Sequence, residues 1–135
     1  MASILKVDSL TGVTTAGSIS VTGEGNSTTT NLQQGLCKTW LSYNHDTPAV
    51  RDSFNVASVT DAATGQFRPS YSNNMASVNY AAYGTAQNSG TVRLATGSDI
   101  YSTSASDYFV RYNNSGTDTA YDYDKVTAAV NGDLA

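Results

Sequence analysis

The sequence has very few of the residues on which catalytic and metal centres depend. It contains 1 histidine (His45), 1 cysteine (Cys37) and a single glutamate (Glu24). A zinc site needs several Cys or His ligands, and a Ser-His-Asp triad would depend on His45 alone. A glycosidase needs two carboxylates held at a defined separation, and no motif selects such a pair. The sequence therefore predicts a protein that is not an enzyme and holds no metal or cofactor.

The two rare side chains, cysteine and histidine, also have local settings that predict where they lie. Cys37 excludes an intrachain disulfide, and it stands shortly before Trp40 in a segment with strand character, which predicts a buried structural thiol. His45 is flanked by Asn44 and Asp46 ahead of Pro48. This setting predicts a histidine at the tip of a loop.

Charge is scarce, and the basic residues are not clustered. Charged residues make up 13% of the chain, with 7 Lys plus Arg against 11 Asp plus Glu, a net charge of −4. The basic residues stand singly, whereas a nucleic-acid surface needs them grouped. No apolar run approaches the ~20 residues of a membrane span, and no charged leader precedes an apolar segment. We therefore expect a soluble protein without a secretory signal, nucleic-acid partner or membrane insertion.

Long helices are not expected either, because no stretch sustains apolar residues at helical spacing. Short strand-like segments recur instead, with turn residues about every 8 to 12 positions. This pattern predicts an all-β fold with a β-sandwich or jelly-roll-like domain over residues 36–135. The expected strands are 38–44, 52–59, 66–71, 78–86, 91–95, 107–112 and 125–130.

The alternation within these segments indicates which side chains face inward. Leu41 and Tyr43 share one face of their strand, and Trp40 lies on the other. Trp40, Phe54 and Phe67 are expected on an inward or an interface face. Pro69 cannot donate to a ladder, so its strand should lie at an edge or be interrupted.

Residues 1–35 differ in texture and are expected to form a separate N-terminal β arm. Short strand-like bursts alternate with Thr-Gly, Ala-Gly and Gly-Glu-Gly turns, and they are too sparse in apolar groups to build a core. Copies related by a symmetry axis would supply the missing partner surface, so we expect a homotrimer. A disordered Thr/Ser/Gly-rich leader is the alternative. The expected oligomer or anchor residues are Leu5, Val7, Leu10, Ile19 and Val21.

One segment near the C-terminus combines the residue types of a ligand site. Carboxylates alternate in "TDTAYDYDK", where they suit either a Ca²⁺ loop or solvated charges at a strand edge, and the latter is favoured. Tyrosines beside carboxylates and amides suit a lectin site, although they are also ordinary sheet or interface residues. The candidate ligand residues are Tyr101, Tyr121, Tyr123, Asp118, Asp122 and Asp124.

Three stretches carry a resemblance to a known class of proteins. "ILKVDSL" (4–10), "LQQGLCKTWLSYN" (32–44) and "AVRDSFNVASVTDAATGQF" (49–67) resemble the adhesin-type, tail-fibre-like structural proteins of marine tailed bacteriophages, including those of cyanobacteria. The resemblance covers most of residues 3–68 and implies a virion protein. Tail fibres usually have a long docking region and shaft, and this chain has room for a stub only.

The resemblance therefore implies a small, non-enzymatic surface appendage: tail-fibre-like, a capsid decoration or knob, or a head fibre. Its expected partners are copies of itself and other capsid or tail proteins, and its expected place is the virion surface after synthesis in the host cytoplasm. The alternative is a receptor-binding lectin module that recognises host surface polysaccharide.

Overall fold

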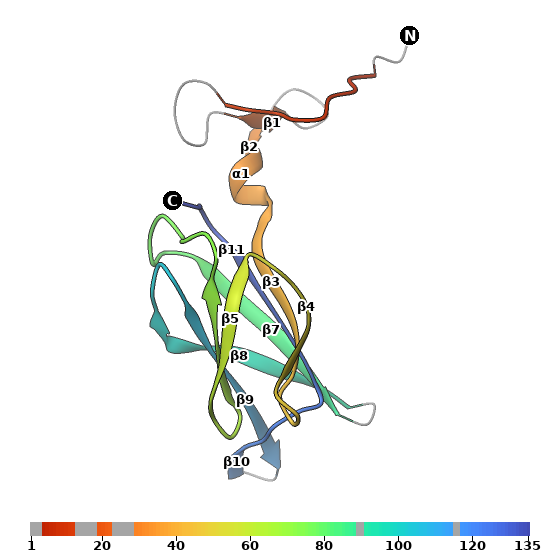
Figure 1. The fold of residues 1–135 in the computed structure, drawn as a ribbon, viewed down its shortest axis with the longest axis vertical. Coiled ribbons are helices and arrows are strands. Elements are labelled where there is room, and N and C mark those ends of the chain that lie inside the picture. Colours follow the sequence, from red (N-terminus) through yellow and green to blue (C-terminus); the bar gives the residue numbers. More distant parts are fainter. Residues whose placement is uncertain (1–3, 13–18, 23–28, 89–90, 115–116) are drawn as a thin grey trace. The chain divides into compact units, whose positions relative to one another are not determined.

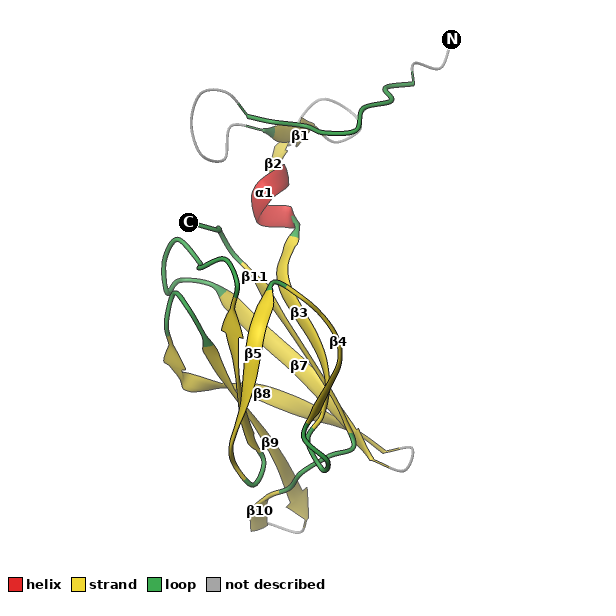
Figure 2. Ribbon diagram, in the orientation of Figure 1, coloured by secondary structure: helices red, strands yellow, loops and turns green. Residues whose placement is uncertain are grey.

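The computed structural model describes residues 4–12, 19–22, 29–88, 91–114 and 117–135, and Glu24 lies outside them. The chain divides into two compact units, Met1–Leu36 and Cys37–Ala135. The division falls beside the boundary expected between residues 35 and 36. Strands make up most of the second unit, and the first contains a short hairpin and one helical turn (Figure 2), so the predicted all-β class is confirmed.

The first unit contains a small hairpin. Strand β1 (Ser20–Thr22) pairs antiparallel with β2 (Thr29–Asn31), and the four-residue helix α1 (Leu32–Gly35) follows. The Leu32 N–H donates to the Ile19 carbonyl over 2.9 Å. Two strands of three residues have little stability of their own in water.

The second unit is built around one continuous antiparallel sheet (Figure 1). Its strand order is β4-β3-β11-β7-β8-β9-β6-β5, and β10 pairs with β9 outside this path. The jelly-roll and trimer parts of the expectation stay predictions. The strands are β3 (Cys37–Asn44), β4 (Ala49–Phe54), β5 (Val56–Ala63), β6 (Gln66–Tyr71), β7 (Ala81–Asn88), β8 (Thr91–Tyr101), β9 (Ser106–Asn114), β10 (Thr117–Ala120) and β11 (Lys125–Asn131).

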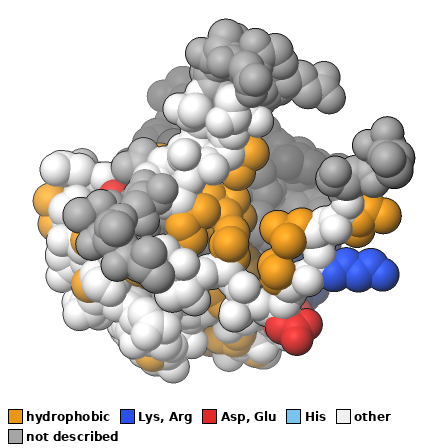
Figure 3. Space-filling model, turned by 90° about the horizontal axis from the view of Figure 1, so that it is seen from above, with side chains coloured by type: hydrophobic (Ala, Val, Ile, Leu, Met, Phe, Trp, Pro, Cys, Tyr) orange, Lys and Arg blue, Asp and Glu red, His pale blue; other side chains and the backbone are white. Residues whose placement is uncertain are grey.

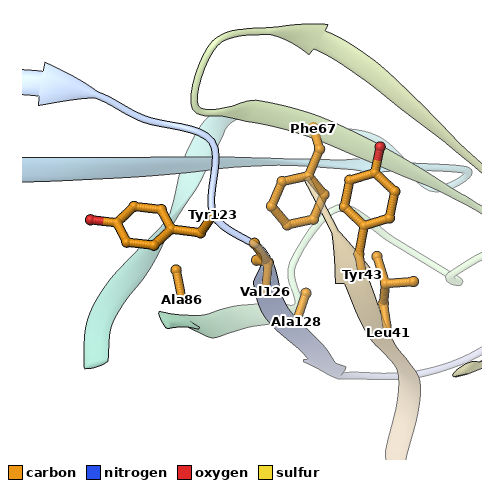
Figure 4. Close-up of a cluster of buried hydrophobic side chains, with 7 residues drawn as sticks. All are labelled: Leu41, Tyr43, Phe67, Ala86, Tyr123, Val126 and Ala128. Carbon is orange, nitrogen blue, oxygen red and sulfur yellow. The ribbon is translucent and has the colours of Figure 1, made fainter. Parts of the chain in front are cut away.

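The sheet curls so that strands distant in its order share a core. Leu41 and Tyr43 of β3 are buried, as their alternation predicts, and they cluster with Phe67 of β6. Figure 4 shows Leu41 and the rings of Tyr43 and Phe67 in one cluster with Val126 of β11. A second cluster joins Tyr71, Met75 and Val130.

A single residue connects the two edge strands. Asn55 lies between β4 and β5 with a left-handed φ of 57°. The strand expected over 52–59 is therefore wrong, because the backbone reverses at Asn55. Asparagine tolerates this conformation better than other residues with a side chain. As a result, Phe54 and Val56 belong to different strands at opposite ends of the sheet.

The position of Pro69 agrees with an interrupted strand. β6 pairs with β9 at Gln66 and Phe67, and an isolated bridge from Ser70 to Ala105 follows. Pro69 itself pairs with Val59 of β5 and is fully buried. The missing N–H of proline thus falls where the ladder to β9 has already stopped.

The expectation of a buried thiol at Cys37 is wrong. Cys37 is exposed at the start of β3, and its thiol donates to the Thr39 carbonyl over 3.0 Å. Leu41 and Tyr43 take the inward positions further along the strand. Among the helices that the structure describes, none has the length and apolar character needed to cross a membrane.

Candidate functional site around His45 and the Tyr121–Asp124 loop

The loop that leads into β11 is attached to the end of β3 by its backbone. The N–H groups of His45 and Asp46 donate to the Tyr123 carbonyl over 2.9 and 3.3 Å. The Arg51 guanidinium donates to the Asp124 carbonyl over 2.6 Å. Residues that sequence analysis assigned to a ligand loop are thus held against β3 and β4.

The side chain of His45 is buried at the centre of this site, so the expected loop-tip position is wrong. Its Nε2 lies 3.2 Å from Asp61 Oδ1 and 3.4 Å from Asp122 Oδ1. Its Nδ1 is also buried and has no hydrogen-bond partner among the described residues. The turn after Asn44 therefore points its histidine inward, toward two carboxylates.

These two carboxylates come from different parts of the fold. Asp61 belongs to β5, and Asp122 belongs to the loop before β11. Asp122 Oδ1 also accepts a hydrogen bond from the Gly65 N–H over 2.6 Å. The imidazole and Asp122 together connect the end of β3, the β5–β6 hairpin and the loop before β11.

Aromatic rings cover the imidazole from the core side. The ring centres of Tyr43 and Phe67 lie 5.7 and 5.5 Å from that of His45, and Phe67 meets it edge-on. Burial raises the pKa of the Tyr43 phenol, and the nearby charges of Asp61 and Asp122 raise it further. The site is therefore unfavourable for any additional negative charge.

We expect the second unit to lose stability in alkali through Tyr43. Below pH about 10 the phenol keeps its proton whether the chain is folded or unfolded. Above that pH the unfolded chain releases the proton first, because the folded pKa is raised, so the free energy of unfolding falls as pH rises. Denaturant titrations across this range should show a flatter decline for Tyr43→Phe. Tyr121→Phe, at an exposed ring, is the control, and an equal flattening there would contradict the assignment.

The arrangement around His45 suits a structural connection better than catalysis. A general base must reach a proton on its substrate, whereas Nε2 here is buried and faces two carboxylates. No group of His, Cys, Asp or Glu able to hold a metal ion is found within the described ranges. The chemistry that remains is a hydrogen bond between the imidazole and Asp61, with the Asp122 carboxylate close to the same nitrogen.

The predicted ligand residues are divided by this geometry. Tyr121 is exposed, while Tyr123 is buried in the core and meets the Tyr121 ring edge-on with centres 5.1 Å apart. Asp122 is directed toward His45 and Gly65. Asp124 is exposed. The loop itself therefore offers one exposed ring beside one exposed carboxylate.

The other two predicted ligand residues, Tyr101 of β8 and Asp118 of β10, pair with opposite ends of β9. Tyr101 pairs with Ser106 at the start of that strand, and Asp118 of β10 pairs with Asn113 near its end. At roughly 3.3 Å per residue, these positions are about 23 Å apart along the strand. The side chains of Tyr101 and Asp118 are not described. The sheet register does not bring the six residues together.

A second candidate surface lies on the outer side of the sheet, and sequence analysis identified it only in part. Phe54 of β4 pairs with Trp40 of β3, which pairs with Ala129 of β11, which pairs with Tyr83 of β7. We call Phe54, Trp40, Ala129 and Tyr83 the aromatic row. Phe54 is 51% exposed, Trp40 38% and Tyr83 54%. Trp40 and Phe54 were expected on an inward or an interface face. Their exposure excludes the inward face.

Comparisons with known proteins leave the family of the chain open. No family model matches the sequence, and no curated protein or solved structure gives a significant match. Function must therefore be argued from the residues and surfaces described above.

Proposed function

We propose that the chain is a non-enzymatic structural protein of a bacteriophage virion, a small surface appendage that assembles as a homotrimer. The resemblance of residues 4–10 and 32–67 to tail-fibre-like proteins supports the virion role. The pairing of His45 with two carboxylates, which leaves its Nε2 no access to a substrate, supports a role without catalysis. In the view of Figure 3, charged side chains (blue and red) occupy a small part of the described surface, and apolar side chains (orange) lie exposed on it.

The observation that carries the proposal is the exposure of aliphatic side chains in the first unit. Ile4 and Leu5 are 79% and 81% exposed, and Val7, Leu10 and Val21 are more than half exposed. Apolar groups gathered in one short segment usually mark a contact surface. Each buried Å² of apolar surface contributes about 25 cal/mol, so burial between copies would stabilise an assembly.

The lectin alternative receives less support. A glycan site on the Tyr121–Asp124 loop requires rings that a sugar can cover, and Tyr123 is buried. Asp122 is already engaged by Gly65 and His45. The two residues left for a ligand, Tyr121 and Asp124, make a smaller site than the sequence suggests.

Native mass spectrometry of the chain at micromolar concentration should show three copies per particle. The double change Leu5→Asp with Val7→Asp should release monomers, because it places charges in the surface that we assign to contacts between copies. The matched control, Ser9→Asp with Thr11→Asp, adds the same charge at exposed polar positions of the same segment. A monomeric parent chain, or equal dissociation of both variants, would contradict the proposal.

The virion role has a separate test. A gold-labelled antibody raised against the chain should decorate the surface of particles of the phage that encodes it. Absence of the chain from purified particles would refute the virion role and leave the result on trimer formation standing.

A further inference from the structure

The aromatic row brings together three of the exposed large apolar side chains that the structure describes in the second unit. Phe54, Trp40, Ala129 and Tyr83 face each other across β4, β3, β11 and β7. These are four successive strands of the sheet (Figure 1). Aromatic side chains each carry about 150–250 Å² of surface, so the three exposed fractions amount to roughly 300 Å². The largest apolar patch on a monomer is commonly about 300–600 Å² and is often functional, so the row is of a size that can serve as the centre of a contact.

On one side, the row is bordered by residues that are polar and uncharged, apart from one carboxylate. The neighbouring row on the same face pairs across the same four strands. The hydroxyls of Thr85 and Thr127 are hydrogen-bonded to each other over 2.8 Å. An apolar aromatic centre with a polar border is the composition of a protein–protein interface. This second row consists of Asp52, Ser42, Thr127 and Thr85.

We propose that the aromatic row contacts a second copy of this chain, so that the sheet faces of the second unit, and not only the N-terminal segment, hold the trimer together. This inference rests on the proposed trimer. Copies tethered by their first units would meet at an effective concentration of about millimolar, so a modest face suffices. A standard interface buries about 800 Å² per partner. The aromatic row would supply its apolar centre, and the second row would supply part of its polar border.

A polysaccharide is a less suitable occupant of this face. Sugar recognition needs rings together with polar groups that are free to bind hydroxyls. The Tyr83 hydroxyl donates to Asn131 Oδ1 over 2.8 Å, and the Thr85 and Thr127 hydroxyls are paired with each other. These three hydroxyls are thus hydrogen-bonded within the chain, which favours an apolar protein contact.

The chain's only tryptophan, Trp40, reports directly on this contact. We expect its fluorescence in the assembled parent chain to be quenched by acrylamide several-fold less than in the dissociated Leu5→Asp, Val7→Asp chain. This measurement needs no change in the row itself. An assembled parent chain whose Trp40 is quenched as readily as in the dissociated variant would overturn the inference and leave the proposed trimer intact. A monomeric parent chain would overturn both.

Variants of the row give an independent measurement. Phe54→Ser with Tyr83→Ser should weaken association of the full chain at least about tenfold, the scale of losing an interface anchor. The control is Val78→Ser with Tyr121→Ser, which removes two side chains that are each 49% exposed and lie outside the row. Equal weakening in both variants would overturn the inference. A row variant that remains trimeric would also overturn it. If that variant had lost binding to host polysaccharide, the row would be a glycan site instead.

Discussion

Phe67→Ala is expected to lower the free energy of unfolding by about 3–5 kcal/mol, the usual cost of removing a buried phenylalanine ring. Phe67 is fully buried, and its ring centre lies 5.5 Å from those of both Tyr43 and His45. The side chains around Phe67 are themselves packed in the core, Leu41 and Tyr43 of β3 and Val126 of β11 among them. We therefore expect the space left by the ring to remain a cavity.

The measurement is a denaturant titration in the dissociated Leu5→Asp, Val7→Asp background, so that unfolding is not coupled to subunit association. Phe54→Ala is the matched control, since it makes the same change at a half-exposed ring. We expect a loss of about 1 kcal/mol or less there, as for other surface positions. Similar small losses for both variants would show that Phe67 is not part of the core.

Asn55→Ala should be the most damaging change at the link between the edge strands, with a loss of about 2–4 kcal/mol. The Asn55 amide donates to the carbonyls of Lys38 and Asn73 over 3.1 and 3.0 Å, and to Thr39 Oγ1 over 3.2 Å. Its Oδ1 accepts from the Asn73 N–H over 2.7 Å. Alanine would lose all of these bonds. It would also have to adopt the left-handed conformation, which costs about 1–2 kcal/mol.

Asn55→Gly separates the two contributions, because glycine adopts a positive φ without strain but makes none of the side-chain bonds. It should recover about 1 kcal/mol relative to alanine when both are measured by denaturant unfolding in the dissociated background. Equal stability of the glycine and alanine variants would show that backbone strain does not contribute. An alanine variant as stable as the parent would show that the side-chain hydrogen bonds do not contribute either.

The features predicted correctly from sequence are those that depend on neighbouring residues. The alternation of Leu41 and Tyr43 needs only the two-residue period of a strand, and both are buried. Phe67, expected on an inward or an interface face, is fully buried in β6. The gap between the expected strands 52–59 and 66–71 contains the turn from β5 to β6, where Gly65 takes a positive φ.

The environment of His45 was not predictable, because its partners are remote in sequence. The polar neighbours Asn44 and Asp46 describe a turn, and a turn does occur there. Asp61 and Asp122 are brought to the imidazole only when the β5–β6 hairpin and the loop before β11 meet the end of β3. The same limitation explains Tyr101 and Asp118, whose separation depends on the register along β9.

The strand break at Asn55 and the extra strand β10 were missed for a different reason. Asn55 stands among residues typical of strands, and nothing in the two-residue pattern distinguishes a left-handed asparagine from an extended one. β10 occupies part of a segment rich in Asn, Ser, Gly and Thr that reads as a loop. The outward side of Trp40 could be predicted from its parity, but not the aromatic neighbours Phe54 and Tyr83 that the register supplies.

The central place of β11 has a consequence for the order in which the protein can form. β11 is the last strand of the second unit to be synthesised, yet it lies between β3, the first, and β7. Until it leaves the ribosome, β3 and β7 lack the strand that joins them, and Leu41 and Tyr43 lack Val126 and Ala128. Such non-local pairing slows folding, so β3 lacks a partner on the side that β11 will occupy until nearly the whole unit has been translated.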